Sequence, residues 1–440
     1  MKKYFFYIIL IGISIVMLLL YFNYSRPYNI DITKSVYLQK TPTGKQLMRH
    51  GFPFYIKGVS GTAYFKELAK IGGNTIRVYD TTNVGHILDE AERYNLAVIV
   101  DIPLPKFGKY YNPYSEESYN IQLQKDVKRF VNKHKNHPAL LIWNLGNELN
   151  YPLVIRKNNF IKTFNSLIDL IHLEDPNHLV STTISGTSRG QTFGIYIHSS
   201  KIDLLGFNVF SNLKDLNALN SKISFVTETI PYYVSEWGIN GPWEAAKNDW
   251  DAILELNSTQ KGAFSKETYK NYIKNDDLSL GSLAFYWGTK IEGTPTWFNI
   301  FDADGRKSQT FYDLQSLWST PKNSVKLPPQ INAMFLKGMI DQEHVVLKPN
   351  DLVDARISLQ NERDTTLVYK WEIYKEGWGN QEWIYETSLN TFQINDDDKG
   401  KSITFITPRK EGPYRLFAYV YDTHNNFSTA NIPFYVLNGQ

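Results

Sequence analysis

Eight short apolar runs alternate with amphipathic stretches along the first two thirds of the chain. The runs lie at residues 54–59, 74–79, 96–102, 139–145, 178–184, 203–210, 232–237 and 282–287. Between most of them lies a stretch with helical spacing, such as NVGHILDEAERY. Strands that alternate with helices indicate βαβ units and a parallel sheet. The pattern therefore predicts an α/β fold, a (β/α)8 TIM barrel over residues 26–320. A doubly wound open sheet is the competing fold, but no Gly-rich phosphate fingerprint follows the first strand.

The pattern changes after the predicted barrel. Pro321, Pro328 and Pro329 mark a linker at residues 321–330. From residue 331 to 440 short strands such as KSITFITP and YRLFAYVYD follow one another, separated by turns and without helical stretches. Regular short strands of this kind predict a C-terminal all-β sandwich, an Ig-like domain.

The N-terminal segment, residues 1–25, is unlike the rest of the chain. Residues 4–22 carry no charge and are mostly apolar, close to the length of about 20 residues that a helix needs to cross a bilayer. Lys2 and Lys3 precede the run, which orients the N-terminus to the cytoplasm and the remainder to the outside. No small-x-small cleavage site follows, so we predict an uncleaved single-pass membrane anchor. A cleaved signal peptide, and hence a secreted protein, is the alternative.

Composition narrows the possible chemistry. The net charge of +3 is small and gives no indication of nucleic-acid binding. The chain has no Cys, which excludes disulfides, thiol catalysis and thiolate metal sites. Aromatic residues make up 15% of the chain, as in sugar-binding clefts, although a large core would need as many. No cofactor or metal site is predicted, and the oligomeric state is left open.

Two carboxylates stand where predicted strands end. Glu148 follows the fourth run, in LLIWNLGNE, and Glu236 ends the seventh, in YYVSEWG. In a (β/α)8 barrel the active site lies at the C-terminal ends of the strands, and strands four and seven face each other across the mouth. Paired carboxylates across a cleft are what glycoside hydrolysis needs: one protonates the leaving oxygen, and the other attacks the sugar or activates water. Taken singly, each Glu would also suit a salt bridge or a helix cap.

The segments NHPALLIWNLGNE and VSEWG resemble the acid/base and nucleophile motifs of clan A glycoside hydrolases. The likeness covers roughly residues 50–318, is closest to the catalytic domain of family 2, and has some similarity to families 5 and 72. The resemblance implies a retaining mechanism with Glu148 as acid/base and Glu236 as nucleophile. It also implies that Asn147 hydrogen-bonds the sugar 2-hydroxyl. Arg77, in GGNTIRVYD, would keep Glu236 ionised, because a nearby cation lowers the pKa of a carboxyl group.

The same resemblance suggests aromatic substrate contacts. Trp287, at the end of the eighth run, would be the platform under the reacting sugar. Trp237, Trp243 and Trp297 are candidates for outer subsites. Asp101, which ends the third run, would either hydrogen-bond the sugar or serve the structure.

The chain also departs from the family pattern. Many members have a Tyr near the end of strand six that donates a hydrogen bond to the nucleophile, whereas this segment reads GFNVFSN. Phe210 cannot donate, so either Asn208 or another residue takes that role, or the balance of hydrolysis and transfer differs. In addition, the predicted sandwich follows the barrel, whereas family 2 enzymes usually carry β-sandwich domains before it. That order favours a polysaccharide of the cell envelope or the exterior as substrate.

The sequence thus predicts a retaining β-glycoside hydrolase that acts on an extracytoplasmic polysaccharide or oligosaccharide. One alternative is a transglycosylase that remodels an envelope glucan. Another is a catalytically silent carbohydrate-binding barrel, which the presence of both Glu148 and Glu236 disfavours. A metal-dependent hydrolase is disfavoured as well, since no His pair or Asp/His cluster falls at the predicted strand ends.

Overall fold

The chain divides into two compact units. The first comprises Met1–Trp237 and Asn271–Ala284, and the second comprises Gly238–Lys270 and Phe285–Gln440. The computed structural model describes residues 2–24, 32–41, 44–108, 110–224, 230–274, 278–319, 325–340, 344–360, 366–376, 392–394 and 400–438. Part of the predicted linker, residues 321–324, lies outside this set. The predicted domain boundaries at residues 320 and 331 stay a prediction.

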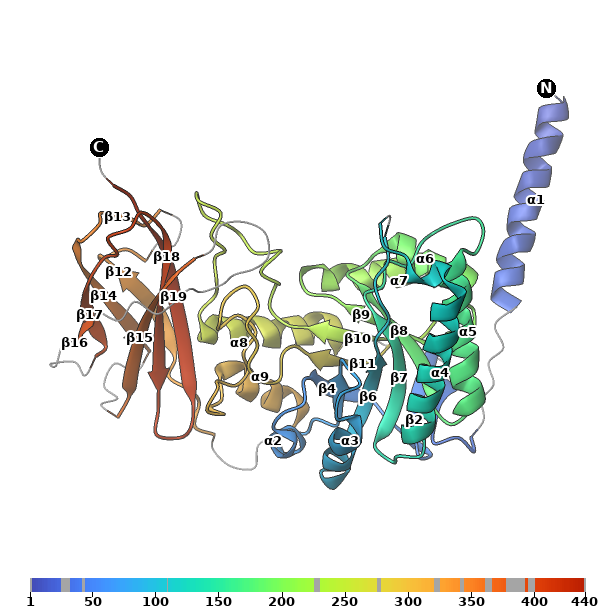
Figure 1. The fold of residues 1–440 in the computed structure, drawn as a ribbon, viewed down its shortest axis with the longest axis horizontal. Helices are drawn as coiled ribbons and strands as arrows, with labels where there is room; N and C mark the ends of the chain where they lie inside the picture. The colour runs from blue at the N-terminus through green and yellow to red at the C-terminus, as the bar shows by residue number, and fades with distance from the viewer. Residues whose placement is uncertain are drawn as a thin grey trace. The chain divides into compact units, whose positions relative to one another are not determined.

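The first unit contains a closed barrel of eight parallel strands, which confirms the predicted barrel (Figure 1). The strands follow one another around the barrel in chain order, and β11 pairs with β4 to close it. They are buried because the barrel wall has neighbours on both faces, which explains their nearly continuous apolar character. The strands are β4 (Ile56–Ser60), β5 (Thr75–Val78), β6 (Ala97–Ile102), β7 (Leu140–Asn147), β8 (Leu179–Ser185), β9 (Leu204–Asn208), β10 (Tyr232–Trp237) and β11 (Ser279–Ala284).

The helices of the first unit, apart from the N-terminal one, connect successive barrel strands and lie outside them (Figure 1). In α5 the side chain of Asn158 accepts a hydrogen bond from the backbone N–H of Ile161, which caps the helix start. Its buried side chains, among them Phe160, Phe164 and Leu167, recur at helical spacing. Burial of each such side chain contributes about 1.5–3 kcal/mol. The helices are α2 (Phe65–Lys70), α3 (Val84–Arg93), α4 (Glu117–His134), α5 (Asn159–Glu174), α6 (Arg189–His198) and α7 (Leu216–Ser224), with 3-10 turns η1 (Pro113–Ser115) and η2 (Ser211–Asp215).

A small antiparallel sheet closes one end of the barrel. Its strands are β1 (Val36–Thr41), β2 (Gly44–Arg49) and β3 (Phe52–Pro53). Val36, Leu38 and Leu47 share one hydrophobic core with residues at the first positions of the barrel strands, such as Ile56 and Ala97. Because the sheet covers the ends where the strands begin, the ends where they finish form the open mouth.

Helix α1 (Lys2–Tyr24) falls in the segment predicted to be a membrane anchor or signal. Among the residues that the structure describes, no helix is both long enough and apolar enough to cross a membrane.

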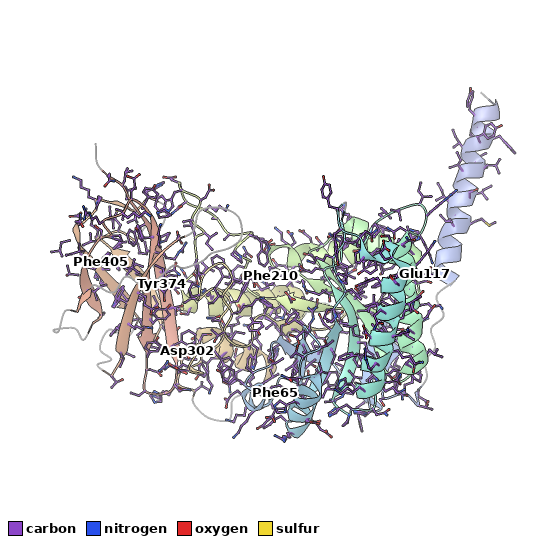
Figure 2. The ribbon with its side chains drawn as sticks, in the orientation of Figure 1. Phe65, Glu117, Phe210, Asp302, Tyr374 and Phe405 are labelled. Carbon is purple, nitrogen blue, oxygen red and sulfur yellow. The ribbon has the colours of Figure 1, made fainter. Side chains whose placement is uncertain are left out.

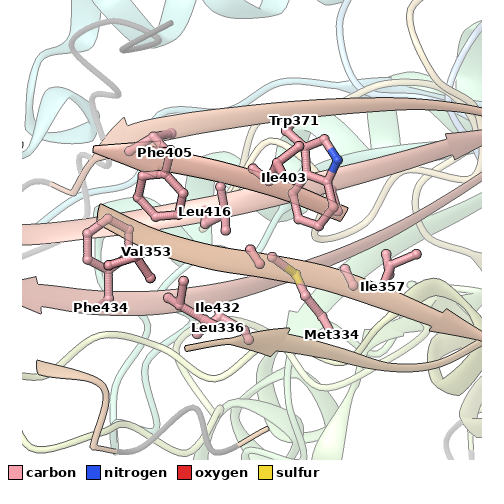
Figure 3. Packing of buried hydrophobic residues seen from close by; sticks show 14 of the residues in the cluster. Met334, Leu336, Val353, Ile357, Trp371, Ile403, Phe405, Leu416, Ile432 and Phe434 are labelled. Carbon is pink, nitrogen blue, oxygen red and sulfur yellow. The ribbon is translucent and has the colours of Figure 1, made fainter. Parts of the chain in front are cut away.

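The second unit contains two four-stranded sheets that share one hydrophobic core, as expected for a β-sandwich (Figure 3). In β14, Val353, Ala355 and Ile357 face that core, and the alternate residues Asp354 and Arg356 are exposed. This alternation is the period of a strand with one buried face. The sheets have the orders β12-β14-β17-β16 and β13-β19-β18-β15. Their strands are β12 (Ile331–Leu336), β13 (Val346–Leu347), β14 (Leu352–Leu359), β15 (Val368–Lys375), β16 (Phe392–Ile394), β17 (Ser402–Ile406), β18 (Gly412–Tyr421) and β19 (Phe427–Val436).

A buried network of charges connects the sandwich to the helical part of the second unit. The helices of that part are α8 (Ser258–Thr268) and α9 (Gln309–Trp318), and a π-helical turn, η3 (Tyr269–Ile273), follows α8. Glu255 pairs with Lys261 of α8 and accepts a hydrogen bond of 2.8 Å from Nδ2 of Asn431 in β19. Arg415 of β18 pairs with Glu376 and donates to the Asn431 Oδ1, 2.6 Å away. Two cations and two carboxylates are therefore buried together, each with a partner of opposite sign.

Candidate active site

The chain turns sharply where β7 ends, and this turn positions Glu148. Gly146 has φ 77°, and a Cβ at this glycine would lie 2.4 Å from a methyl carbon of Leu149, so a larger residue would be strained and would displace that side chain. Glu148 has φ 51°, a left-handed backbone conformation that is rare for Glu. Its N–H donates to the Thr183 carbonyl of the neighbouring strand at 3.0 Å. Such conformations are retained mostly where a site needs a particular side-chain direction.

Arg77, in β5, is the centre of the hydrogen-bond network at the mouth. Its side chain is fully buried, and it binds Asp101 through two parallel hydrogen bonds, Nε to Oδ1 at 3.0 Å and Nη2 to Oδ2 at 2.7 Å. On its other side, Nη1 donates to Oε1 of Glu236 and to Oδ1 of Asn208, both at 3.1 Å. Nη2 also donates to Oδ1 of Asn147 at 2.9 Å. One guanidinium thus joins the ends of strands β6, β7, β9 and β10.

The charges of this network are set by burial and by neighbouring groups. Burial alone would lower the pKa of Arg77, but the adjacent Asp101 and Glu236 raise it well above its usual value. The guanidinium therefore stays charged. Burial raises the pKa of Asp101, with Arg77 opposing the rise. Asp101 is buried and bound to Arg77, so it acts on the arginine, and the structural alternative of its two predicted roles is the one that the geometry fits.

Tyr79 is a residue of the site that the sequence did not single out. Its hydroxyl donates to Oε1 of Glu236 at 2.9 Å, and the guanidinium of Arg77 lies 4.7 Å from the centre of its ring. Burial and the charge of Glu236 raise the pKa of Tyr79 well above its usual value, so the hydroxyl keeps its proton. In the family pattern a Tyr of strand six donates to the nucleophile, and here Tyr79, which follows β5, supplies the hydroxyl instead. Phe210, labelled in Figure 2, is itself buried.

Asn208 contacts the other carboxylate. Its Nδ2 donates to Oε1 of Glu148 at 3.0 Å and to Oδ1 of Asn147 at 3.1 Å. Its own Oδ1 accepts hydrogen bonds from Arg77 and, at 2.8 Å, from Ser235. Asn208 therefore orients the predicted acid/base residue, and the hydroxyl that donates to Glu236 belongs to Tyr79. Because Oδ1 of Asn147 accepts two hydrogen bonds, the Nδ2 of Asn147 is the group that this arrangement leaves for a substrate hydroxyl.

The structure brings Glu148, Glu236, Asn147, Arg77 and Asn208 together in one hydrogen-bond network. Each carboxylate is one hydrogen bond away from the Arg77–Asn208 pair. The roles of these residues in catalysis stay predictions. The sequence signal that would have found Tyr79 is its place in GGNTIRVYD, directly after the strand that carries Arg77.

The tryptophan predictions fare differently. Trp287 is fully buried and packs on Phe301 and Phe311, with ring centres 4.9 and 5.7 Å apart. It has no free face for a sugar, so the platform prediction is wrong. Trp237 is also fully buried, which contradicts its predicted substrate contact.

The two weaker tryptophan candidates belong to the second unit. Trp297 is buried, and its indole N–H donates to the Asn240 carbonyl at 2.9 Å, so it does not suit an outer subsite. Trp243 is exposed and stays a candidate. Both apolar burial and substrate stacking select tryptophan, and the sequence pattern alone does not separate them.

Within the residues that the structure describes, no group of three His, Asp or Glu side chains is arranged to hold a metal ion. What the site presents instead is a pair of carboxylates with different surroundings. Glu236 is almost buried between the donors Arg77 and Tyr79. Glu148 is more accessible, with Asn208 on one oxygen and the ammonium of Lys106 at 3.6 Å from the other.

Comparison with known proteins gives a family match for this part of the chain. Residues 67–274 match the family described as "Glycosyl hydrolases family 2, TIM barrel domain". The matched segment includes Arg77, Tyr79, Glu148, Asn208 and Glu236. A curated relative, the beta-glucuronidase of Chlorocebus aethiops, is 28% identical over 127 residues, which is 24% of this chain and 18% of the relative.

Solved structures resemble the fold. The beta-glucuronidase of Bacteroides uniformis has a TM-score of 0.50 and 14% identity, over 92% of this chain and 48% of that one. A GH2 beta-galacturonidase from Eisenbergiella tayi, bound to galacturonate, has a TM-score of 0.51 and 15% identity, over 65% of this chain and 54% of that one. The chain thus spans about half the length of these structures and a smaller part of the curated relative.

Proposed function

The barrel is a clan A glycoside hydrolase domain of the family 2 type, and from that premise we propose that the chain is a retaining β-glycosidase. The observation that carries the proposal is the Arg77–Asn208 pair, which is hydrogen-bonded to Glu236 on one side and to Glu148 on the other. Paired carboxylates with unlike surroundings are the pattern in which one group stays ionised and the other exchanges a proton.

In the first step, the carboxylate of Glu236 attacks the anomeric carbon. The bond to the leaving oxygen breaks, and the proton of Glu148 passes to that oxygen. The product is a glycosyl ester of Glu236. In the second step, Glu148 takes a proton from water, and the water oxygen attacks the anomeric carbon from the face that the leaving group left, opposite the ester, which breaks the bond to Glu236. The sugar leaves with its original configuration, and both glutamates return to their first state.

The neighbouring residues support these roles. Arg77 and Tyr79 both donate to Oε1 of Glu236, and donors to the ionised form stabilise a carboxylate. That stabilisation suits a group that must attack as an anion and depart as one. Asn147 would hydrogen-bond the sugar 2-hydroxyl, a contact that strengthens in the transition state.

The substrate we propose is a β-linked polysaccharide or oligosaccharide, with hydrolysis as the main outcome. Since the curated relative is named a beta-glucuronidase, β-glucuronides belong in a test panel beside β-glucosides and β-galactosides. The location we propose is outside the cytoplasm, with the chain either anchored in the membrane or secreted. The proposal rests on Lys2, Lys3 and the uncharged run at residues 4–22.

A glycan panel tests the activity. The fragment from about residue 25 and its Glu236→Gln variant are incubated with each glycan, and the products are separated by chromatography and followed by NMR. We expect at least one β-linked glycan to be cleaved by the parent alone, with the β-anomer formed first. An α-anomer as first product would refute retention, and longer products would indicate transfer. Cleavage by both proteins at equal rates would refute the assignment.

The location is tested on the full chain. N-terminal sequencing of the mature protein, with fractionation of the producing cells, distinguishes the alternatives. We expect an intact N-terminus in the membrane fraction. A first residue between about 20 and 30 would show cleavage of a signal and refute the anchor.

A further inference from the structure

Lys106 stands beside the predicted acid/base residue. It lies in the segment between β6 and α4, and its Nζ is 3.6 Å from Oε2 of Glu148. The side chain of Lys106 is 56% exposed, so a bound substrate can reach it. The opposite oxygen, Oε1, is held by Asn208. Lys106 therefore lies beside the oxygen of Glu148 that Asn208 does not hold.

The backbone on each side of Lys106 is fixed. The Pro105 carbonyl accepts a hydrogen bond of 2.7 Å from the hydroxyl of Tyr114. The ring of Phe107 packs on that of Phe160, with centres 4.5 Å apart, and also contacts Tyr114. The backbone from which the Lys106 side chain extends is thus held by neighbours of the same unit.

The ion pair between Lys106 and Glu148 is hard to explain by stability. Pairs with this much exposure contribute little, about 0–1 kcal/mol. In addition, the proposed first step requires a protonated Glu148, which no longer offers Lys106 a negative partner. In the part of the chain that the structure describes, Glu148 is the one carboxylate within ion-pair distance of Lys106. The productive complex therefore has an ammonium at the mouth that a substrate anion would satisfy.

We propose that Lys106 determines specificity for a glycan with an acidic group on the leaving-group side of the cleaved bond. The proposal rests on the proposed function. Because Glu148 protonates the leaving oxygen, it marks that side of the bond, and a cation beside its carboxylate faces the first sugar beyond. A lysine ammonium is a point charge that accepts a carboxylate or a sulfate ester in many orientations. The class of substrate is thus an acidic glycan, carrying uronic acid or sulfate.

Three variants test this. Lys106→Met removes the charge and keeps an unbranched side chain, and Lys106→Arg keeps the charge. Lys133→Met is the matched control, because Lys133 is exposed in the last turn of α4, which leads to the start of β7 and so lies away from the mouth. Substrates are used in pairs: a uronic-acid polymer with its carboxyl-reduced form, and a sulfated polymer with its desulfated form.

The measured quantity is the ratio of kcat/KM on the acidic member to that on the neutral member. We expect the parent to prefer one acidic member, and the pair that shows the preference identifies the group. Lys106→Met should lower the ratio about five- to tenfold, as for a charge-assisted contact that the bound glycan shields from water. Lys106→Arg should keep most of the parental ratio, and Lys133→Met should leave the ratio unchanged. Added salt should reduce the ratio in the parent. Equal ratios in the parent and Lys106→Met would overturn the proposal while the glycosidase activity stands.

Binding provides a readout that does not need turnover. Gel retardation of the parent and of Lys106→Met is compared in gels that contain each polymer. Stronger retardation of the parent by an acidic polymer, lost in Lys106→Met, supports the site even where no glycan is cleaved, in which case only the proposed activity fails. Equal retardation of both proteins by acidic and neutral polymers would refute the site.

Discussion

Each unit of the protein buries an arginine among carboxylates, yet the two clusters differ in balance and access. In the second unit, Arg415 pairs with Glu376, and Lys261 pairs with Glu255, so that cations and carboxylates are equal in number. In the first unit, Arg77 alone faces both Asp101 and Glu236. The barrel cluster thus carries an extra negative charge beside an opening.

The difference separates a structural network from a reactive one. Burial of a charge is costly unless a partner of opposite sign compensates it. In the second unit, each buried cation has a carboxylate partner and each buried carboxylate has a cation. A buried carboxylate without a full counter-charge is typical of a functional site. A buried salt bridge is therefore weak evidence of an active site. A buried cluster with an extra negative charge that a substrate can reach is stronger evidence. Three substitutions test this contrast.

Glu236→Ala should lower turnover about 10⁴-fold or more, as for loss of a nucleophile, while the variant unfolds at a temperature close to that of the parent. Azide or formate should restore part of the rate, because a small anion fits the space that the side chain leaves. The product of the rescued reaction should have inverted configuration, which NMR detects. Near-normal activity on a glycan that the parent cleaves would refute the nucleophile assignment.

Glu255→Gln should lower the free energy of unfolding by about 3–5 kcal/mol, because it leaves Lys261 buried without its carboxylate. Urea unfolding followed by fluorescence measures the change. Burial raises the pKa of Glu255, but Lys261 and the hydroxyl of Thr294 outweigh burial and lower it. Ionised Glu255 therefore stabilises the fold above its unfolded pKa, and this contribution disappears as the pH falls through the lowered pKa. Glu267→Gln, on the exposed side of α8, is the control and should change stability by less than about 0.5 kcal/mol.

Equal stability of Glu255→Gln and the control would contradict a structural role for the second cluster. A loss of turnover without a loss of stability would do so as well, because it would indicate that this cluster takes part in the reaction.

Tyr79→Phe should lower turnover about ten- to a hundredfold, since a hydrogen bond to a charged group contributes about 1.5–3 kcal/mol. The hydroxyl stabilises the carboxylate of Glu236 as it is released, so the second step should slow more than the first. Pre-steady-state kinetics would then show a burst of leaving group and a lower KM. Tyr272→Phe, a surface change in the same unit, should leave both constants unaltered. A Tyr79→Phe variant with parental kcat would show that Tyr79 does not act on Glu236 during the reaction.

Local sequence was enough to predict the barrel and the place of its carboxylates. Runs such as LLIWNLGN are apolar throughout because a barrel wall is covered on both sides, and β7 (Leu140–Asn147) forms where that run predicts it. The residue directly past a strand of a (β/α)8 barrel lies at the mouth whatever the rest of the chain does. Glu148 and Glu236 could therefore be placed from their positions alone.

Tertiary structure decided which side chains meet and which are covered. Tyr79 and Glu236 are 157 positions apart in the chain, and they contact each other because closure of the barrel brings the ends of β5 and β10 to one network. Trp237 and Trp287 end strand-like runs as a sugar platform would, yet packing buries both. The two-residue alternation of a strand predicts which side chains share a face of the sheet. Whether that face meets the core or the cleft depends on neighbours distant in the chain, and only the folded barrel supplies them.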